Sequence, residues 1–148
     1  MTVENGAIIP LSLQKQAQLL LQTLIVRGEK VATAESCTGG LLAATLTEVA
    51  GCSEAFDMGL VSYSNGIKHR YLDVSEETLA SVGAVSPEVA EAMAKGICQA
   101  AKAQLGVGIT GIAGPGGGSS MKPVGLVYYG VCYRGRVVVK RHCFTGER

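Results

Sequence analysis

The sequence lacks the features that mark several large classes of protein. Charged residues make up only 17% of it, and its 13 basic and 12 acidic side chains leave a formal net charge of +1. Such an even balance excludes the broad basic surface on which proteins bind nucleic acid directly. No apolar run approaches the roughly 20 residues of a membrane-spanning helix, and no basic stretch followed by an apolar run opens the chain. We therefore expect a cytoplasmic protein with no membrane association.

The cysteines form no pattern typical of cross-linking or of metal binding. There are five of them, an odd number, and none lies in a Cys-x-x-Cys pair. A disulfide framework and a zinc site both need paired or clustered thiols at short, regular spacings. The sequence therefore favours free thiols in a reducing compartment.

What the sequence does contain is an alternation of helical and strand patterns over 148 residues, a usual size for one domain. The patterns predict helices over 11–27 and 38–49, a short helix after Ser75 and a helix that Ser86 and Pro87 begin. They predict strands over 31–35, 56–64, 107–112, 124–133 and 137–144, the last two joined as a hairpin by 134–136. We expect residues 1–10 to be an N-terminal tail. We expect residues 11–148 to form one α/β/α sandwich whose mixed sheet ends in an antiparallel hairpin.

A first candidate site lies where the strand over 31–35 passes into the next helix. The segment reads Thr-Ala-Glu-Ser-Cys-Thr-Gly-Gly over residues 33–40. A helix N-terminus offers unpaired backbone N–H groups, so Ser36 could attack a carbonyl while these groups bind the oxyanion. The same hydroxyl could simply cap the helix. Cys37 is a rival nucleophile, because a helix N-terminus favours a thiolate.

A second candidate site is the segment Tyr-Ser-Asn-Gly-Ile-Lys over residues 63–68. Asn65 and Gly66 predict a turn that ends the strand, which would place Tyr63 and Lys68 at one edge of the sheet. A serine nucleophile needs a base, and a lysine can serve if burial or a nearby cation lowers its pKa. Tyr63 could then bind Ser36 or relay its proton. The spacing also allows a packed tyrosine and a solvated lysine.

A third candidate site is the glycine-rich run that follows the strand over 107–112. Residues 111–119 read Gly-Ile-Ala-Gly-Pro-Gly-Gly-Gly-Ser. Glycines let backbone N–H groups converge on an anion such as a phosphate, although a flexible connection is the plainer interpretation. No Gly-Lys-Ser/Thr follows, so this is not a Walker A loop, and the Gly-x-Gly-x-x-Gly over 106–111 lies within a strand rather than opening a helix.

Together these segments resemble the CinA C-terminal domain family. The matching stretches occur in order from about residue 11 onward and are 33–40, 61–65 with Lys68, 83–86, 110–118 with 122–125, and 144–148. Glu147 stands where the family pattern usually has aspartate before its final arginine. The resemblance also implies a further helix after that arginine, which would cover one face of the sheet.

The resemblance implies an enzyme that hydrolyses the carboxamide of nicotinamide mononucleotide to nicotinic acid mononucleotide and ammonia, in pyridine nucleotide salvage. It implies Ser36 as nucleophile with Lys68 and Tyr63 as its partners, and neither a metal nor another cofactor. It further implies a bacterial cytoplasmic protein that forms a homodimer or a higher homo-oligomer. The residues expected to contact the substrate are Cys37, Thr38, Gly39, Thr110, Gly111, Gly114, Gly116 and Arg148.

One alternative stays open. The glycine-rich run could bind a nucleotide without turnover, which would make the chain a regulatory module linked to competence or to the DNA damage response. The joint presence of Ser36, Tyr63 and Lys68 favours the enzyme over this module.

Overall fold

The computed structural model describes residues 9–147. In chain order its elements are α1 (Leu11–Arg27), β1 (Val31–Glu35), α2 (Leu41–Thr47), the 3₁₀ helix η2 (Cys52–Glu54), β2 (Phe56–Val61), α3 (Asn65–Leu72), α4 (Glu76–Val82), α5 (Pro87–Ala101), β3 (Leu105–Gly111), β4 (Leu126–Tyr133) and β5 (Arg136–Cys143). No helix within this part of the chain is both long and apolar enough to cross a membrane.

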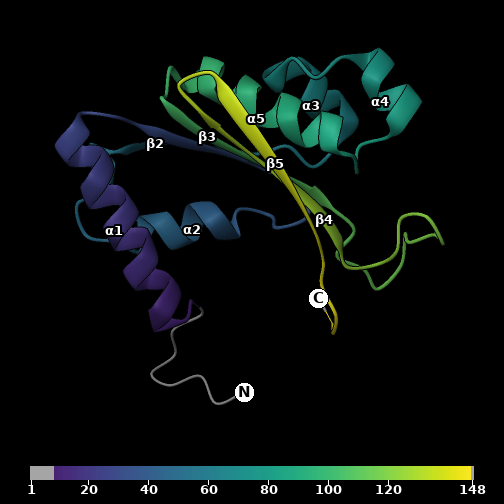
Figure 1. The fold of residues 1–148 in the computed structure, drawn as a ribbon, viewed down its shortest axis with the longest axis horizontal. Helices are drawn as coiled ribbons and strands as arrows, with labels where there is room; N and C mark the ends of the chain where they lie inside the picture. The colour runs from purple at the N-terminus through teal and green to yellow at the C-terminus, as the bar shows by residue number, and fades with distance from the viewer. Residues whose placement is uncertain (1–8, 148) are drawn as a thin grey trace.

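The strands form one mixed sheet in the order β2-β1-β3-β4-β5. β1 is parallel to both β2 and β3, whereas β4 is antiparallel to both β3 and β5. Helices α1 and α2 lie on one side of the sheet, and α3, α4 and α5 lie on the other (Figure 1). The predicted α/β/α sandwich with a terminal antiparallel hairpin is therefore confirmed.

Local capping chemistry explains why three helices begin or end where the sequence predicts. The hydroxyl of Ser86 accepts the N–H of Val89, and Pro87 occupies the first turn of α5. The hydroxyl of Ser75 accepts the N–H of Thr78 in the same way at the start of α4. Gly28 ends α1 in the left-handed conformation, at a φ of 66°.

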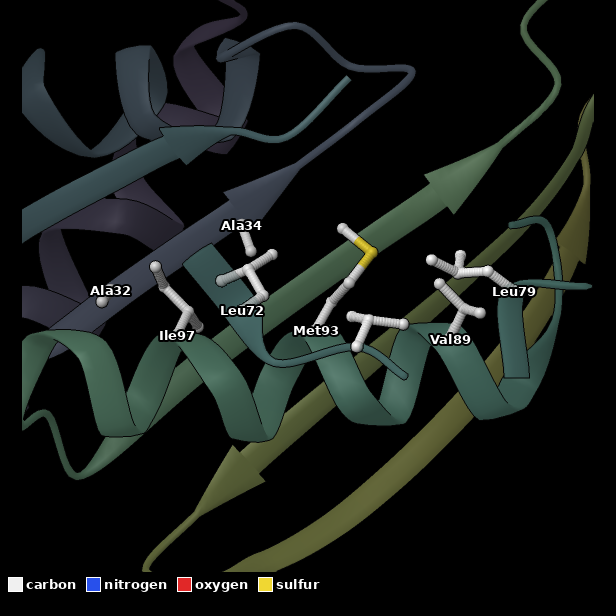
Figure 2. Packing of buried hydrophobic residues seen from close by; sticks show 8 residues of the cluster. Ala32, Ala34, Leu72, Leu79, Val89, Met93 and Ile97 are labelled. Carbon is white, nitrogen blue, oxygen red and sulfur yellow. The ribbon is translucent and has the colours of Figure 1, made fainter. Parts of the chain in front are cut away.

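Helix α5 forms the core on its side of the sheet. Val89, Met93 and Ile97 project from one side of α5 (Figure 2), are fully buried, and belong to one cluster with Ala32 and Ala34 of β1. Burying side chains of this size contributes about 1.5–3 kcal/mol each. This face of α5 thus fixes the helix over the parallel strands.

Missing side chains let α5 approach its neighbours closely. A Cβ atom at Gly108 or at Gly130 would lie 2.6 Å from backbone atoms of α5, and one at Gly106 would lie 2.6 Å from the Ala94 carbonyl oxygen. At Gly96 a Cβ atom would lie 2.0 Å from the carbonyl oxygen of Leu72, at the end of α3. Glycine is therefore required where α5 contacts the sheet and where α3 contacts α5.

Two predicted boundaries are wrong by three residues, and the other differences are smaller. Helix α2 begins at Leu41 rather than at residue 38, because Gly39 and Gly40 have φ values of 60° and 102° and form a left-handed turn first. Strand β2 ends at Val61 rather than at residue 64, and Asn65-Gly66 opens α3 instead of forming a turn. The hydroxyl of Ser64 accepts the N–H of Ile67, so Ser64 acts as the helix cap.

Candidate active site

The parallel strands set the position of Ser36. Glu35, the last residue of β1, pairs with Val61 of β2 and Ile109 of β3, so these strands end at one edge of the sheet. Ser36 follows directly, and its N–H donates to the carbonyl of Ile109 at 3.0 Å. Ligands of α/β proteins bind at such carboxyl ends. The side chain of Ser36 is 8% exposed, so its hydroxyl lies in a pocket rather than on an open surface.

Lys68 contacts Ser36 from helix α3. It is the fourth residue of α3, and its Nζ is 3.0 Å from the Oγ of Ser36. Lys68 is only 1% exposed, which is rare for a lysine and gives it no direct access to bulk water. Burial lowers the pKa of the Lys68 amine below its usual value, and the negative charge of a Cys37 thiolate opposes this shift.

The other partners of Lys68 indicate how its amine can act. The Nζ donates to the carbonyl of Ser62 at 2.7 Å and to that of Tyr63 at 3.3 Å. Carbonyl oxygens can only accept, so a neutral amine would use both of its N–H groups on them. Its remaining lone pair would then be available to the Ser36 hydroxyl. The arrangement suits proton transfer from serine to lysine.

The side chain of Tyr63 lies near the predicted pair but is largely exposed. Its carbonyl contacts Lys68, but the side chain is 63% exposed and no hydrogen bond of its hydroxyl is found within residues 9–147. Tyr63 nevertheless lines the cavity that contains Ser36. The structure therefore brings Ser36 and Lys68 into contact and places the tyrosine at the border of the same cavity.

The cavity has a volume of about 290 Å³ and opens beside Ser36 and Lys68. The glycine-rich run forms part of its wall and contributes Gly111, Gly114, Gly116 and Gly117. Thr110 also lines the cavity, is 1% exposed, and donates its hydroxyl proton to the carbonyl of Ala84 at 2.8 Å. The predicted third segment thus meets the first two in one pocket.

The remaining predicted contacts divide into three groups. Cys37 lines the cavity together with Ser36. Thr38 lines an adjoining apolar groove of about 380 Å³, which shares Cys37, Ile112 and Ala113 with the cavity. Gly39 is exposed, and its N–H donates to the carbonyl of Ser36 at 3.1 Å. The N–H of Gly39 is therefore engaged in the turn and is not available for an oxyanion. Arg148 lies outside the described residues.

Sequence patterns did not single out Glu35, the residue directly before Ser36, whose carboxylate the structure places against the start of α2. Its carboxylate accepts the N–H groups of Leu42 at 2.8 Å and Ala43 at 3.0 Å, while the side chain is 1% exposed. Its carbonyl accepts the N–H of Ser62 at 2.7 Å. Glu35, the residue before Ser36, thus connects the start of α2 with the end of β2. The only signal in the sequence is an acidic residue ahead of a helix N-terminus.

The helix N-terminus that was expected to bind an oxyanion is already occupied. Helix α2 starts at Leu41, and the N–H groups that its first turn offers at Leu42 and Ala43 are held by Glu35. Among residues 9–147, no three histidine, cysteine or acidic side chains gather as a metal site would require.

The fold and the site together define a class of protein: an α/β/α sandwich with a serine–lysine pair at the carboxyl ends of its parallel strands. A sequence model described as the CinA C-terminal domain matches residues 13–148. The chain therefore belongs to the CinA C-terminal domain family, and the resemblance seen in its motifs is confirmed.

Relatives of known sequence carry two kinds of name. A protein of Moorella thermoacetica with the provisional name competence-damage inducible protein is 57% identical over 125 residues, which are 84% of this chain and 30% of that protein. The chain thus spans less than a third of the length of this relative. A protein of Enterobacter agglomerans named nicotinamide-nucleotide amidohydrolase PncC is 50% identical over 126 residues, 84% of this chain and 77% of that protein.

Solved structures share the fold. The competence/damage inducible protein CihA of Agrobacterium tumefaciens superimposes with a TM-score of 0.91 at 43% identity, over 94% of this chain and 85% of that chain. A CinA superfamily protein of Escherichia coli superimposes with a TM-score of 0.88 at 32% identity, over 99% of this chain and 88% of that chain.

Proposed function

We propose that the chain is an amidohydrolase that converts nicotinamide mononucleotide and water to nicotinic acid mononucleotide and ammonia. The contact that carries the proposal is the 3.0 Å hydrogen bond between the buried Lys68 amine and the Ser36 hydroxyl. The name of the Enterobacter agglomerans relative supports the choice of substrate, since that protein is an amidohydrolase of a nicotinamide nucleotide.

In the first half of the proposed reaction, Ser36 replaces the amide nitrogen. The neutral amine of Lys68 takes the hydroxyl proton as the Oγ of Ser36 attacks the carboxamide carbon. Backbone N–H groups near Cys37 and Thr38 stabilise the tetrahedral oxyanion. The C–N bond then breaks, and the nitrogen takes the proton from the Lys68 ammonium and leaves as ammonia. An ester between Ser36 and the nicotinoyl group remains.

In the second half, water releases the acid. Lys68 accepts a proton from the water that attacks the ester, and it returns this proton to the Oγ of Ser36 as the C–O bond breaks. Tyr63, which lines the cavity, assists Lys68 or contacts the ring of the substrate in this proposal. The glycine-rich wall supplies backbone to bind the phosphate, because glycine lets N–H groups approach an anion closely.

The test is an ammonia-release assay with nicotinamide mononucleotide, run beside nicotinamide and nicotinamide riboside. Turnover of the mononucleotide but not of the other two supports both the reaction and phosphate binding. Ser36→Ala should lower kcat by about 10³-fold or more while the protein stays folded. Retention of the native rate by Ser36→Ala would exclude the proposed nucleophile. Tight binding of the mononucleotide without turnover by the native protein would favour a regulatory module instead.

A further inference from the structure

Thr110 and Ser36 are neighbours on one face of the sheet. The β1–β3 ladder pairs Glu35 with Ile109, and the N–H of Ser36 continues it by donating to the Ile109 carbonyl. Side chains alternate along a strand, so Thr110 and Ser36 point to the same side, on adjacent strands about 4.8 Å apart. That side is the one that Lys68 and α5 occupy. Thr110 therefore stands next to the nucleophile and within the same cavity.

The hydroxyl of Thr110 can act only as an acceptor toward the cavity. A threonine hydroxyl has one proton and two acceptor lone pairs. Its proton is used on the carbonyl of Ala84, at 2.8 Å, and a carbonyl cannot donate in return. Within residues 9–147 no donor to the Oγ1 of Thr110 is found, although the side chain is 1% exposed. A buried oxygen with unused lone pairs thus lies beside Ser36.

We propose that Thr110 is a specificity-determining residue: its Oγ1 accepts an N–H from the carboxamide of the substrate and disfavours the carboxylate of the product. This inference rests on the proposed amidohydrolase function. A carboxamide nitrogen carries two donors, whereas an ionised carboxylate has only acceptors. The substrate donates a hydrogen bond to the Oγ1 of Thr110. With the product bound, this oxygen instead faces a carboxylate oxygen, and both atoms can only accept. Leaving a buried polar group unpaired in this way is a strong basis for discrimination.

The arrangement also has a consequence for the reaction. The contact with Thr110 orients the carboxamide nitrogen, the group that leaves, toward β3. Once ammonia has left and water has supplied a second oxygen, the same position holds a carboxylate oxygen and the contact turns repulsive. Thr110 therefore helps to hold the amide before hydrolysis and to expel the acid after it.

The test separates this role from that of a structural tie to Ala84. Thr110→Val keeps the shape but removes the oxygen, and Thr110→Ser keeps the oxygen. For each variant, KM and kcat are measured for nicotinamide mononucleotide, and Ki is measured for nicotinic acid mononucleotide as a competitive inhibitor. We expect Thr110→Val to lower kcat/KM by about 10- to 100-fold. The ratio of Ki to KM should fall by at least about tenfold, because the amide loses a partner and the acid loses a repulsive contact. Thr110→Ser should keep the native ratio.

If Thr110 serves only to connect β3 to the loop before α5, Thr110→Val raises KM and Ki together, and an unchanged ratio overturns the proposal. Should Thr110→Val fail to fold, binding is measured by calorimetry on the Ser36→Ala protein, which keeps Thr110. We then expect the amide to bind about tenfold or more tightly than the analogue with a methyl ketone in its place, which lacks N–H donors. Equal affinity for the two overturns the proposal. Absence of turnover by the native protein would instead refute the proposed function, so the two failures are distinguishable.

Discussion

Ser36 donates its backbone N–H to the carbonyl of Ile109 at 3.0 Å, one residue beyond the end of β1. The proposed nucleophile is therefore held by the hydrogen-bonding ladder of the sheet, although it lies in the segment that connects β1 to α2. A nucleophile fixed in this way needs little reorganisation before attack. Such prior positioning is one of the larger contributions to enzymatic rates. Four predictions follow from the contacts around it and from the packing that supports them.

The proposed base requires activity to rise with pH. Lys68 takes a proton only when neutral, and burial lowers its pKa while the Coulombic interaction with Cys37 opposes the shift. Below the pKa of Lys68, kcat/KM should therefore fall about tenfold per pH unit, and above it a plateau is expected. Lys68→Arg is the matched variant, because an arginine stays charged throughout this range. It should be inactive at every pH, and a native pH–rate profile for Lys68→Arg would refute the assignment.

Glu35→Gln should affect both catalysis and stability. The carboxylate accepts two N–H groups from the start of α2, and a carboxamide in its place sets one donor against another. We expect a free energy of unfolding lower by about 2 kcal/mol, and kcat lower by about tenfold with KM little changed. Urea denaturation and steady-state kinetics give the two quantities. Glu54→Gln changes an exposed carboxylate and is the control; if the two variants behave alike, Glu35 does not position the loop.

Glu29→Gln should remove part of the resistance to acid. The pKa of the Glu29 carboxyl is raised by burial but lowered more by hydrogen bonds from Arg134 and Tyr133, so that it lies below its usual value. A carboxylate whose pKa is lowered by folding stabilises the protein above its unfolded pKa of about 4.3 and loses this effect as pH falls through its folded pKa.

The Tm of Glu29→Gln should accordingly lie below that of the native protein at pH 7, and the difference should shrink at pH 3. The exposed pair of Glu91 and Lys95 offers Glu91→Gln as a control, with little change at either pH. A Tm difference for Glu29→Gln that is the same at both pH values would contradict the predicted linkage.

Gly130→Ala should destabilise the contact between α5 and the sheet. The added Cβ would lie 2.6 Å from the Ala90 carbonyl oxygen, which belongs to helix backbone and cannot move alone. We expect the free energy of unfolding to fall by at least about 2 kcal/mol, measured by urea denaturation. Gly116→Ala adds the same methyl where nothing lies within 4 Å, and it should change stability by less than about 0.5 kcal/mol. Equal stabilities of the two variants would show that α5 can shift without cost.

The parts of the fold that the sequence predicts well depend on local chemistry. Helix boundaries are predicted reliably where a cap forms within a few residues. Examples are the capping hydrogen bonds of Ser86 and Ser75 and the left-handed conformation of Gly28. Asn65-Gly66 was misleading because the same two residues tolerate a turn and a helix start, and Ser64 decided between them as a cap.

The sequence predicted the pair of Ser36 and Lys68, but it did not predict the contacts of Glu35 or the exposure of Tyr63. Ser36 and Lys68 are 32 positions apart, and their meeting follows from the strand order β2-β1-β3, which no local pattern encodes. The family resemblance connected them. Glu35 was missed because its importance comes from burial and from its contacts with α2, and the exposed side chain of Tyr63 depends on how the chain turns before α3.

The packing contact at Gly96 influences the site although it lies outside the cavity. Leu72 ends the helix that carries Lys68 one turn earlier, and it lies against α5 only because Gly96 has no side chain. The position of the Lys68 amine relative to Ser36 thus depends on the spacing between α3 and α5. A larger side chain at Gly96 would lower the proposed activity as a substitution of Lys68 would, while leaving every group in the pocket chemically unchanged.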